Sequence, residues 1–323
     1  MKLSQIGEFG LIDLISKHQS RNKTTIVGIG DDAAVLINPK SENRNPNKYL
    51  LITTDALVEN VHFKKKGLSF YHLGQKALLA NISDIAAMGG APTHAVITIG
   101  LPKNTNVHDI KELYRGINAI AKKNKIDIVG GDTVASPKAI FISITLLGEV
   151  EKEYLLLRSG AKPGDLICVT GVFGGEASKK YETRNSCLPA GTAKYETRLR
   201  ESRIIAKNKI ASSMTDSSDG LVRSVVEICK ASNVGAVIEE NKVPIAEGAT
   251  LKQALYGGEE YELVFTVPEG KASSEKGVGG VRRIKGSTII GRIVPKGEGI
   301  SLEDKRGRIT KLKSMGYEHF HGK

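Results

Sequence analysis

Strand-like and helix-like segments alternate along the first half of the chain, and this alternation limits the folds open to it. Residues 107–125 place apolar side chains three and four positions apart, the spacing of one helix face. A second helix is predicted over 73–88 and is stopped by Gly89, Gly90 and Pro92. Strands are predicted at 48–58, 94–101, 126–133 and 139–150. The alternation predicts an α/β or α+β domain with a substantial sheet.

The pattern restarts near residue 155, and we expect a domain boundary there. RSGAKPGDLICVTG (158–171) reads as a turn and a fresh strand, and 323 residues are enough for two cores. The expected domains are 1–155 and 156–323. In the second, helices are predicted near 199–212 and over 221–231, and strands at 234–240, 261–268 and 287–294. The stretch 173–198, which contains YETR twice, has no readable pattern.

The net charge of +12 makes the chain basic, which suits anionic partners. A nucleic-acid surface is not expected, because the basic clusters are short and the aromatic residues, 5% of the chain, do not interleave with them. The charge instead indicates solvated surface and a general attraction for phosphorylated ligands.

The apolar residues and the cysteines predict a cytoplasmic protein. No window of about 18 apolar residues occurs, so no membrane span is expected. Residues 1–18 resemble an amphipathic helix more than a signal peptide. Cys168, Cys187 and Cys229 are few and scattered, which argues against a disulfide framework or a zinc site and fits a reducing compartment.

The segment GIGDDAA (28–34) combines a phosphate-binding pattern with two charges that oppose it. Gly28, Gly30 and Ala33 fit the glycine-rich dinucleotide pattern, in which bare backbone lets a pyrophosphate approach. Asp31 and Asp32 would repel that phosphate. Either the loop binds no phosphate or a cation lies between them.

Several further acidic signals share one style, a short apolar segment followed by Asp beside a small or polar residue. They are LITTD (Asp55), NISD (Asp84), IVGGD (Asp132) and TDSSDGL (Asp216 and Asp219). Taken singly, each has a structural explanation, such as an N-cap, a turn or a solvated helix face. Several of them follow predicted strands, and if they converge there they would repel one another unless hard cations neutralise them. Oxygen ligands without His or Cys indicate Mg²⁺, Mn²⁺ or Ca²⁺, and glycine-rich backbone nearby favours Mg²⁺ bridging nucleotide phosphates.

The sequence lacks the motifs of other phosphoryl-transfer enzymes. It has no P-loop and no protein-kinase H-R-D or D-F-G set. A phosphoryl transfer here would rest on metals and positioning, and would be easiest with an acceptor that is already an anion.

Seven motifs stand in the order found in thiamine-monophosphate kinases, and the chain resembles that family from about residue 4 to the terminal GYEHF. They are GIGDDAA, TTDALVENVHF, NISDIAAMGG, VGGDT, RSGAKPGD, TDSSDGL and GGEEYEL. TTDALVENVHF and GGEEYEL distinguish this family from its relatives. Those relatives include aminoimidazole-ribonucleotide synthetase, selenophosphate synthetase and the hydrogenase-maturation dehydratase. The reactive N-terminal cysteine of the selenium enzyme is absent, since no cysteine precedes Cys168, and so is the cysteine tail of the maturation enzyme.

The resemblance implies ATP-dependent phosphorylation of thiamine monophosphate to the diphosphate, by direct in-line transfer with several Mg²⁺ ions. It also implies an N-terminal sheet domain that binds ATP and Mg²⁺ and pairs with a second subunit in a homodimer. A C-terminal α/β domain would close over the nucleotide.

Carried onto matching positions, the resemblance implies roles for individual residues. The implied metal ligands are Asp32, Thr53, Thr54, Asp55, Asp84, Asp132, Asp216 and Asp219, with Asp31 as an addition. The implied ATP contacts are Tyr114, Gly131, Asp132, Arg158 and Ser218, and catalysis would depend most on Asp132. The implied substrate contacts are His62, Glu259 and Tyr317.

Several of these residues also suit a structural role. His62 and Arg158 could equally be ordinary surface residues, and Glu259 could be a residue of a solvated turn. Tyr114 lies on the apolar stripe of its helix, which favours core packing. Tyr317 suits either packing or stacking on a cationic ring.

One segment departs from the family. Its relatives carry a His-Leu-x-Pro-x-Pro-Arg run before TDSSDGL, where this chain reads TRLRESRIIA. The change leaves the metal ligands intact but affects the expected substrate lid or subunit contacts in 173–205.

Two other functions fit the same motifs. A sister synthetase would use ATP to activate a carbonyl or amide oxygen and would release phosphate. A non-catalytic protein would bind Mg²⁺ and nucleotide without turnover.

Overall fold

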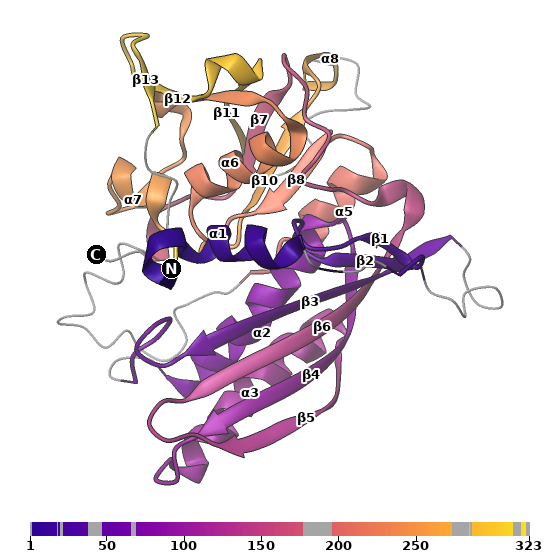
Figure 1. Ribbon diagram of the computed structural model, residues 1–323, viewed down its shortest axis with the longest axis vertical. Helices are drawn as coiled ribbons and strands as arrows, with labels where there is room; N and C mark the ends of the chain where they lie inside the picture. The colour runs from indigo at the N-terminus through magenta and orange to yellow at the C-terminus, as the bar shows by residue number, and fades with distance from the viewer. Residues whose placement is uncertain are drawn as a thin grey trace.

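The chain folds into two β-sheets with helices packed against them, the mixed α/β architecture predicted from the sequence (Figure 1). The computed structural model describes residues 2–17, 19, 22–37, 47–65, 69–176, 196–272, 284, 286–312 and 318–320. The strands of the first sheet lie between residues 25 and 151 and those of the second between 166 and 311, on either side of residue 155. None of the described helices is long and apolar enough to cross a membrane.

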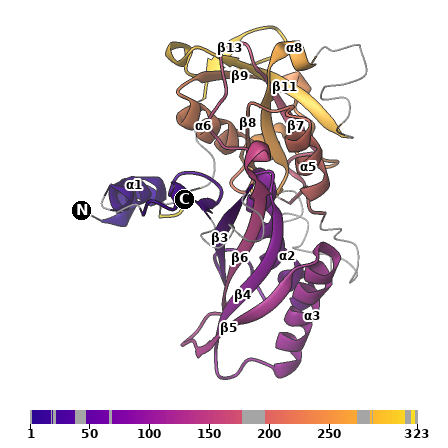
Figure 2. The same ribbon diagram turned by 90° about the vertical axis from the view of Figure 1, so that its right-hand side faces the viewer.

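The first sheet is covered by helices on one face and open on the other. Its strands have the order β1-β2-β3-β6-β4-β5, and only β4 and β5 run parallel. Along β6, buried and half-buried side chains alternate, the pattern of a strand with one face in the core. Helices α2 and α3 pack on that face, and none of the described helices packs on the opposite face (Figure 2). The bounds are β1 Thr25–Val27, β2 Ala34–Ile37, β3 Lys48–Val58, α2 Phe70–Ala87, β4 Ala91–Leu101, α3 Val107–Asn124, β5 Asp127–Ala135 and β6 Phe141–Glu151.

The second sheet has the strand order β13-β12-β9-β11-β7-β10-β8, antiparallel except for β12 and β9. Helix α6 packs against it, and α1, whose Phe9 ring lies under the Arg223 guanidinium of α6, projects to one side of the molecule at the level of the junction (Figure 2). The bounds are α1 Leu3–Ser16, β7 Leu166–Thr170, α5 Leu199–Lys207, β8 Ser213–Asp216, α6 Leu221–Ser232, β9 Gly235–Glu239, α7 Leu251–Tyr256, β10 Leu263–Val267, α8 Glu269–Ala272, β11 Ser287–Val294, β12 Ile300–Glu303 and β13 Ile309–Lys311. Short 3-10 turns occupy Lys152–Tyr154, Glu240–Lys242 and Lys296–Glu298.

Helix α2 joins the two halves. Ser69 caps it by accepting a hydrogen bond from the His72 N–H at 3.1 Å, and most of the helix that follows is buried. It packs on the first sheet, on α3, and on α5 and β8 of the second half. At its C-terminal end, Ala86 lies in the same apolar cluster as Ile205 and Phe265. Side chains on α2 therefore sit between the two sheets.

Several predicted elements differ in their ends, among them the helix predicted over 73–88 and the strand predicted at 94–101, which begin at Phe70 and Ala91. The helix predicted near 199–212 ends at Lys207, because Lys209 adopts a left-handed φ of 51° and β8 begins at Ser213. The strand predicted at 261–268 begins at Leu263, since Tyr261 has a left-handed φ of 53°. Gly7 breaks the N-terminal helix with a φ of 65°. The first YETR copy lies outside the described residues.

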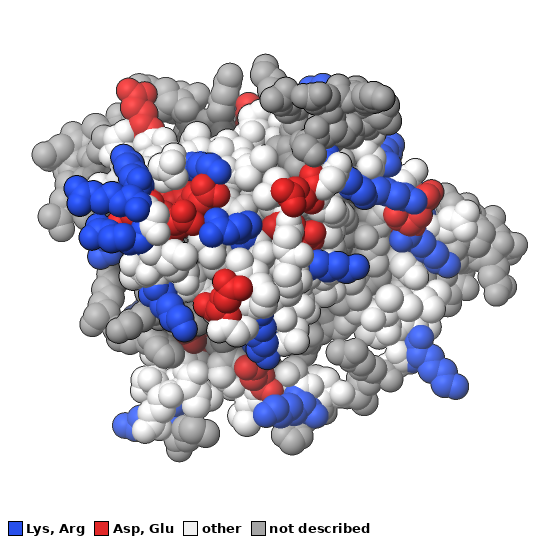
Figure 3. Space-filling model, turned by 90° about the horizontal axis from the view of Figure 1, so that it is seen from above, with Lys and Arg blue, Asp and Glu red and all other residues white. Residues whose placement is uncertain are grey.

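Charges of both signs are interspersed on the face of the second half seen in Figure 3. Acidic side chains lie among the Lys and Arg side chains there. Ion pairs of the second half include Arg292–Glu303 at 3.1 Å. Much of the positive charge on this face is thus locally balanced.

Two glycines let α2 and α3 approach closely. A Cβ on Gly74 would lie 2.0 Å from the Leu113 carbonyl oxygen, and one on Gly116 would lie 1.9 Å from that of Tyr71. These contacts are to backbone, which has little freedom to move away.

We predict that Gly116→Ala lowers the free energy of unfolding by about 1–3 kcal/mol, because the methyl group forces the two helices apart. Urea unfolding followed by circular dichroism measures the loss. Gly297→Ala is the control, since a Cβ there meets no atom within 4 Å. Equal stability of the two variants would contradict the packing argument.

Candidate active site

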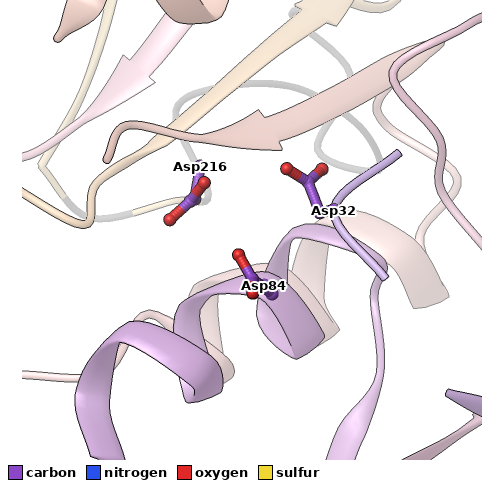
Figure 4. Close-up of side chains that lie close together, drawn as sticks. All are labelled: Asp32, Asp84 and Asp216. Carbon is purple, nitrogen blue, oxygen red and sulfur yellow. The ribbon is translucent and has the colours of Figure 1, made fainter. Parts of the chain in front are cut away.

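Three aspartates from separate elements meet at the junction of the two halves (Figure 4). Asp32 follows β1, Asp84 lies on α2 and Asp216 ends β8. One carboxylate oxygen from each lies within 4.8 Å of the others. The Asp32 side chain has no exposed surface. We call Asp32, Asp84 and Asp216 the acidic cluster.

Each carboxylate of the acidic cluster accepts a hydrogen bond from a neighbouring hydroxyl group. The donors are Thr215 to Asp32 at 2.8 Å, Thr53 to Asp84 at 2.5 Å and Ser83 to Asp216 at 2.6 Å. Arg158 adds a charged contact, with its Nη2 and Nε 2.6 Å and 3.2 Å from Asp32 Oδ1. These donors orient the carboxylates but leave their combined charge only partly balanced.

Burial and mutual repulsion favour the protonated forms of these acids. Burial raises the pKa of Asp216 to about 8, and the charge of Asp32 adds to the effect. Burial also raises the pKa of Asp84 well above its usual value, reinforced by the charges of Asp55, Asp216 and Asp32. Burial raises the pKa of Asp55 to about 6. Asp55 is therefore an electrostatic neighbour of the acidic cluster.

The acidic cluster has the composition of a hard-cation site. Its ligand atoms are carboxylate oxygens, with hydroxyl oxygens beside them and no His or Cys in the group. Asp32 Oδ2 is buried and has no hydrogen-bond partner among the described residues. A buried, unpartnered carboxylate oxygen beside two like charges is what a divalent cation would stabilise. The residues fit Mg²⁺ or Mn²⁺ better than zinc.

Thr53 and Asp55 lie on one face of β3, and Thr54 lies on the other. Alternate residues of a strand face opposite sides, so Thr53 and Asp55 face α2, where the Asp55 N–H donates to Asn81 Oδ1 at 3.1 Å. The Thr54 hydroxyl faces the other way and donates to the Ile144 carbonyl oxygen at 3.2 Å. The structure thus brings two of these three predicted ligands toward the acidic cluster.

Asp31, Ser218 and Asp219 lie around the acidic cluster. The Asp31 carboxylate accepts from the Arg158 N–H at 3.3 Å, and burial, with the charge of Asp32, raises its pKa to about 7. A cavity of about 40 Å³ is lined by Ser218, Asp219, Asp216 and Arg158, among others. Burial raises the pKa of Asp219 to about 6, with Glu8 of α1 adding to the effect.

A second group of polar side chains gathers at the other end of α2. Lys76 of α2 forms an ion pair with Glu259, and both side chains are largely buried. His62 Nδ1 accepts the Val58 N–H at 3.0 Å, and its ring lies 5.3 Å from that of His319. Burial lowers the pKa of His62, His319 and Lys76 lower it further, and Glu259 raises it. We call His62, Lys76, Glu259 and His319 the acceptor group.

The loop TDSSDGL is hydrogen-bonded to the loop GGEEYEL. The Glu259 N–H donates to the Ser218 carbonyl oxygen at 2.6 Å, and the Tyr261 N–H donates to that of Ser217 at 2.9 Å. Glu259 and Tyr261 both adopt left-handed φ values, 72° and 53°, which side chains disfavour. Such strain is typical of functional loops.

Gly131, Asp132 and Tyr114 lie away from the acidic cluster in this chain. Asp55, Ile144, Ile97 and Gly131 stand in one row across β3, β6, β4 and β5. Three strand spacings put Gly131 about 14 Å from Asp55. Tyr114 is half-buried against the core of the first half. Tyr317 lies outside the described residues.

The prediction from sequence did not include Lys76 and His319. Lys76 is the only charged residue of LGQKALLANIS, a signal that marks it as unusual in a buried helix. His319 belongs to the terminal GYEHF, and nothing in its spacing relates it to His62. Only the folded chain places residues 62 and 319 together.

Comparison with known proteins identifies the family of the chain. Residues 30–150 match the family described as AIR synthase related protein, N-terminal domain, and residues 162–302 match the corresponding C-terminal domain. Thiamine-monophosphate kinase of Buchnera aphidicola subsp. Schizaphis graminum is 36% identical over 333 residues, 97% of this chain and 99% of that protein. The chain belongs to the thiamine-monophosphate kinase family.

Other members support the same placement. Thiamine-monophosphate kinase of Bacillus subtilis is 35% identical over 277 residues, 80% of this chain and 83% of that protein. The structure of AaThiL complexed with AMPPCP and TMP matches with a TM-score of 0.82 at 31% identity, over 99% of each chain. The family predicted from the seven motifs is confirmed, and with it the class of enzyme, a phosphotransferase.

We predict that Mg²⁺ stabilises the protein more at pH 8 than at pH 5.5. Folded-state pKa values of about 6 for Asp55 and about 8 for Asp216 exceed the usual 3.8, so stability is lost as pH rises through them. Metal competes with these protons, so its effect grows over the same range. Near 100 times its Kd, Mg²⁺ should add about 2.7 kcal/mol to the free energy of unfolding at pH 8.

Thermal unfolding with and without Mg²⁺ at the two pH values measures this. Asp84→Asn should lose most of the Mg²⁺ effect, whereas Asp304→Asn, in a surface turn of the second half, should keep it. An equal Mg²⁺ effect at both pH values would show that the buried carboxylates do not bind the ion.

Proposed function

We propose that the chain transfers the γ-phosphoryl group of ATP to thiamine monophosphate, giving thiamine diphosphate and ADP. The observation that carries the proposal is the pair of sites along α2, the acidic cluster at one end and the acceptor group at the other. The relatives bear the name of this activity, and AaThiL was solved with AMPPCP and TMP together.

At the nucleotide end, the residues that would hold Mg²⁺ are the acidic cluster with Thr53, Asp55 and Asp219, and, across the subunit interface proposed below, Thr54 and Asp132. Bound Mg²⁺ would neutralise the phosphate oxygens and the carboxylates that face them. Arg158 and Ser218 lie beside the acidic cluster, where a guanidinium and a hydroxyl suit phosphate oxygens. Gly131 and Tyr114 are proposed as further ATP contacts.

The transfer itself requires little acid–base chemistry from the protein. An oxygen of the acceptor phosphate forms a bond to the γ-phosphorus in line with the breaking bond to the bridging oxygen, and ADP leaves. The attacking oxygen is already anionic, so no general base is needed. Positioning and charge neutralisation then provide the rate, as in other phosphoryl transfers.

At the acceptor end, we propose that His62, Glu259 and Tyr317 contact the rings of thiamine monophosphate. The Glu259 carboxylate suits the aminopyrimidine amino group or the cationic thiazolium ring. His62 Nδ1 is engaged by the Val58 N–H, so in the neutral ring Nε2 carries the proton and is the donor.

We further propose that the enzyme is a cytoplasmic homodimer whose subunits share their active sites. The uncovered face of the first sheet carries Val96, 36% exposed, and the edge strand β5 carries Val129, 59% exposed. Apolar residues on an open sheet face favour burial against a second copy. Two-fold pairing would set β5 of one subunit, with Asp132, opposite β3 of the other. The free buried thiols of Cys168 and Cys229 suit a reducing cytoplasm.

We predict that the purified chain with Mg²⁺ and ATP converts thiamine monophosphate, but not thiamine, to thiamine diphosphate. Chromatography of the thiamine species with parallel ADP assay measures it. Asp84→Asn should lower kcat about 100-fold or more, because it removes a proposed ligand of the metal. ATP loss without thiamine diphosphate would indicate a sister synthetase, and ATP binding without loss a binding protein.

We predict that Asp84→Asn and Asp132→Asn, each nearly inactive alone, restore activity when co-expressed. In a shared-site dimer one of the two sites of each heterodimer has both aspartates, so random pairing recovers about a quarter of wild-type activity. Two affinity tags isolate the heterodimer for assay. A heterodimer as inactive as its parents would show that Asp132 does not act across the interface.

A further inference from the structure

Lys76 is a buried lysine of α2 for which the proposed reaction has no role so far. Its side chain is 9% exposed and forms an ion pair with Glu259, whose side chain is 16% exposed. A buried ion pair contributes little net stability relative to apolar side chains of similar size. A requirement that the Glu259 carboxylate be held in a fixed position explains this ion pair better than a contribution to stability does.

Glu259 is held from two directions. Its N–H donates to the Ser218 carbonyl oxygen at 2.6 Å, and its Oε1 accepts from Lys76 Nζ. Between these anchors its backbone has a φ of 72°, a strained value for a residue with a side chain. Lys76 thus holds the carboxylate end of a residue whose backbone is held by the loop of Asp216.

Lys76 and the acidic cluster are spaced by helix geometry. Lys76 and Ser83 are seven residues apart on one face of α2, a rise of about 10 Å. Ser83 donates to Asp216 at 2.6 Å. Between the two ends lies the buried Tyr261, whose pKa is raised well above its usual value by burial and then by the charges of Glu259, Asp55, Asp216 and Asp84. Tyr261 packs with Leu79 and Ala80 of α2, between Lys76 and Ser83.

This spacing suits the charge distribution of the proposed acceptor. Thiamine monophosphate is elongated, with a phosphate at one end and a cationic thiazolium and an aminopyrimidine toward the other. With the phosphate at the acidic cluster and its cations, the rings extend along α2 toward Glu259. An ionised carboxylate in a fixed orientation is the group that accepts a hydrogen bond from the ring amino group.

We propose that Lys76 is a positioning residue of the acceptor site, whose ammonium fixes the Glu259 carboxylate for the ring end of thiamine monophosphate. The inference rests on the proposed function. Lys76 acts through Glu259, so its loss weakens acceptor binding and leaves the nucleotide end unchanged.

The test compares Lys76→Met, Lys76→Arg, Glu259→Gln and the double variant Lys76→Met/Glu259→Gln in full steady-state kinetics. Lys76→Met should raise the KM for thiamine monophosphate about 10- to 100-fold, with the KM for ATP within about twofold of wild type. Lys76→Arg should recover part of the loss, because it keeps the charge. The double variant should resemble Glu259→Gln, since Lys76 acts only through that carboxylate.

Two controls separate the outcomes. Lys48→Met removes a lysine paired with Glu149 at 2.9 Å on the first sheet, outside the acceptor group, and should leave both KM values unchanged. Calorimetric binding of thiamine monophosphate without ATP gives a readout that is independent of turnover. If Lys76→Met alone fails to fold, the double variant, which removes both buried charges, takes its place. Multiplicative effects in the double variant, or an unchanged acceptor KM in Lys76→Met, would overturn the inference alone. A wild-type chain without thiamine diphosphate formation would overturn the proposed function and the inference together.

Discussion

Mutual repulsion among the buried aspartates is the constraint around which the two halves of this chain are arranged. Three carboxylates within 4.8 Å of one another are stable in a folded protein only if their charges are removed or neutralised. The described structure surrounds them with hydroxyl donors and one arginine, which orient the oxygens without balancing the charge. The remaining charge is available to cations. An arrangement that would otherwise oppose folding thus suits the metal-bound phosphate of the proposed function.

The acidic cluster exists only when the two halves are joined. Asp32 comes from the first half, Asp216 from the end of β8 in the second, and Asp84 from the helix between them. Because α2 is buried against both halves, movement of one half relative to the other would displace its aspartate from the cluster. Packing at the junction, including Ala86 against Ile205 and Phe265, therefore sets the geometry of the acidic cluster as well as the stability of the fold. Each half alone would hold an incomplete site.

The parts of this fold that were predictable are those with a local signal. The helices α2 and α3 followed from apolar spacing and glycine stops, and the family followed from the order of its motifs. The predicted C-terminal end of α5 and the predicted start of β10 were wrong. The left-handed residues at 209 and 261 set these ends, and the periodicity of apolar residues does not reveal them. The convergence of Asp32, Asp84 and Asp216 was a hypothesis drawn from residue type. The spacing of these residues along the chain does not establish it. The pairing of His62 with His319 was beyond prediction, since it depends on where the chain returns.

The hydrogen bonds between the loops of Asp216 and Glu259 connect the two ends of the site. One strained segment carries Glu259 to its ion pair with Lys76 and Tyr261 into the space beside the acidic cluster, and the N–H groups of both residues are hydrogen-bonded to the backbone of Ser218 and Ser217. The distance between the ends is therefore set by α2 on one side and by these paired loops on the other. In the proposed function, a rigid spacing of this kind would discriminate by length, because an acceptor bound by its rings would reach the metals only if it carries a phosphate. Selectivity for the monophosphate over free thiamine then needs no separate specificity pocket.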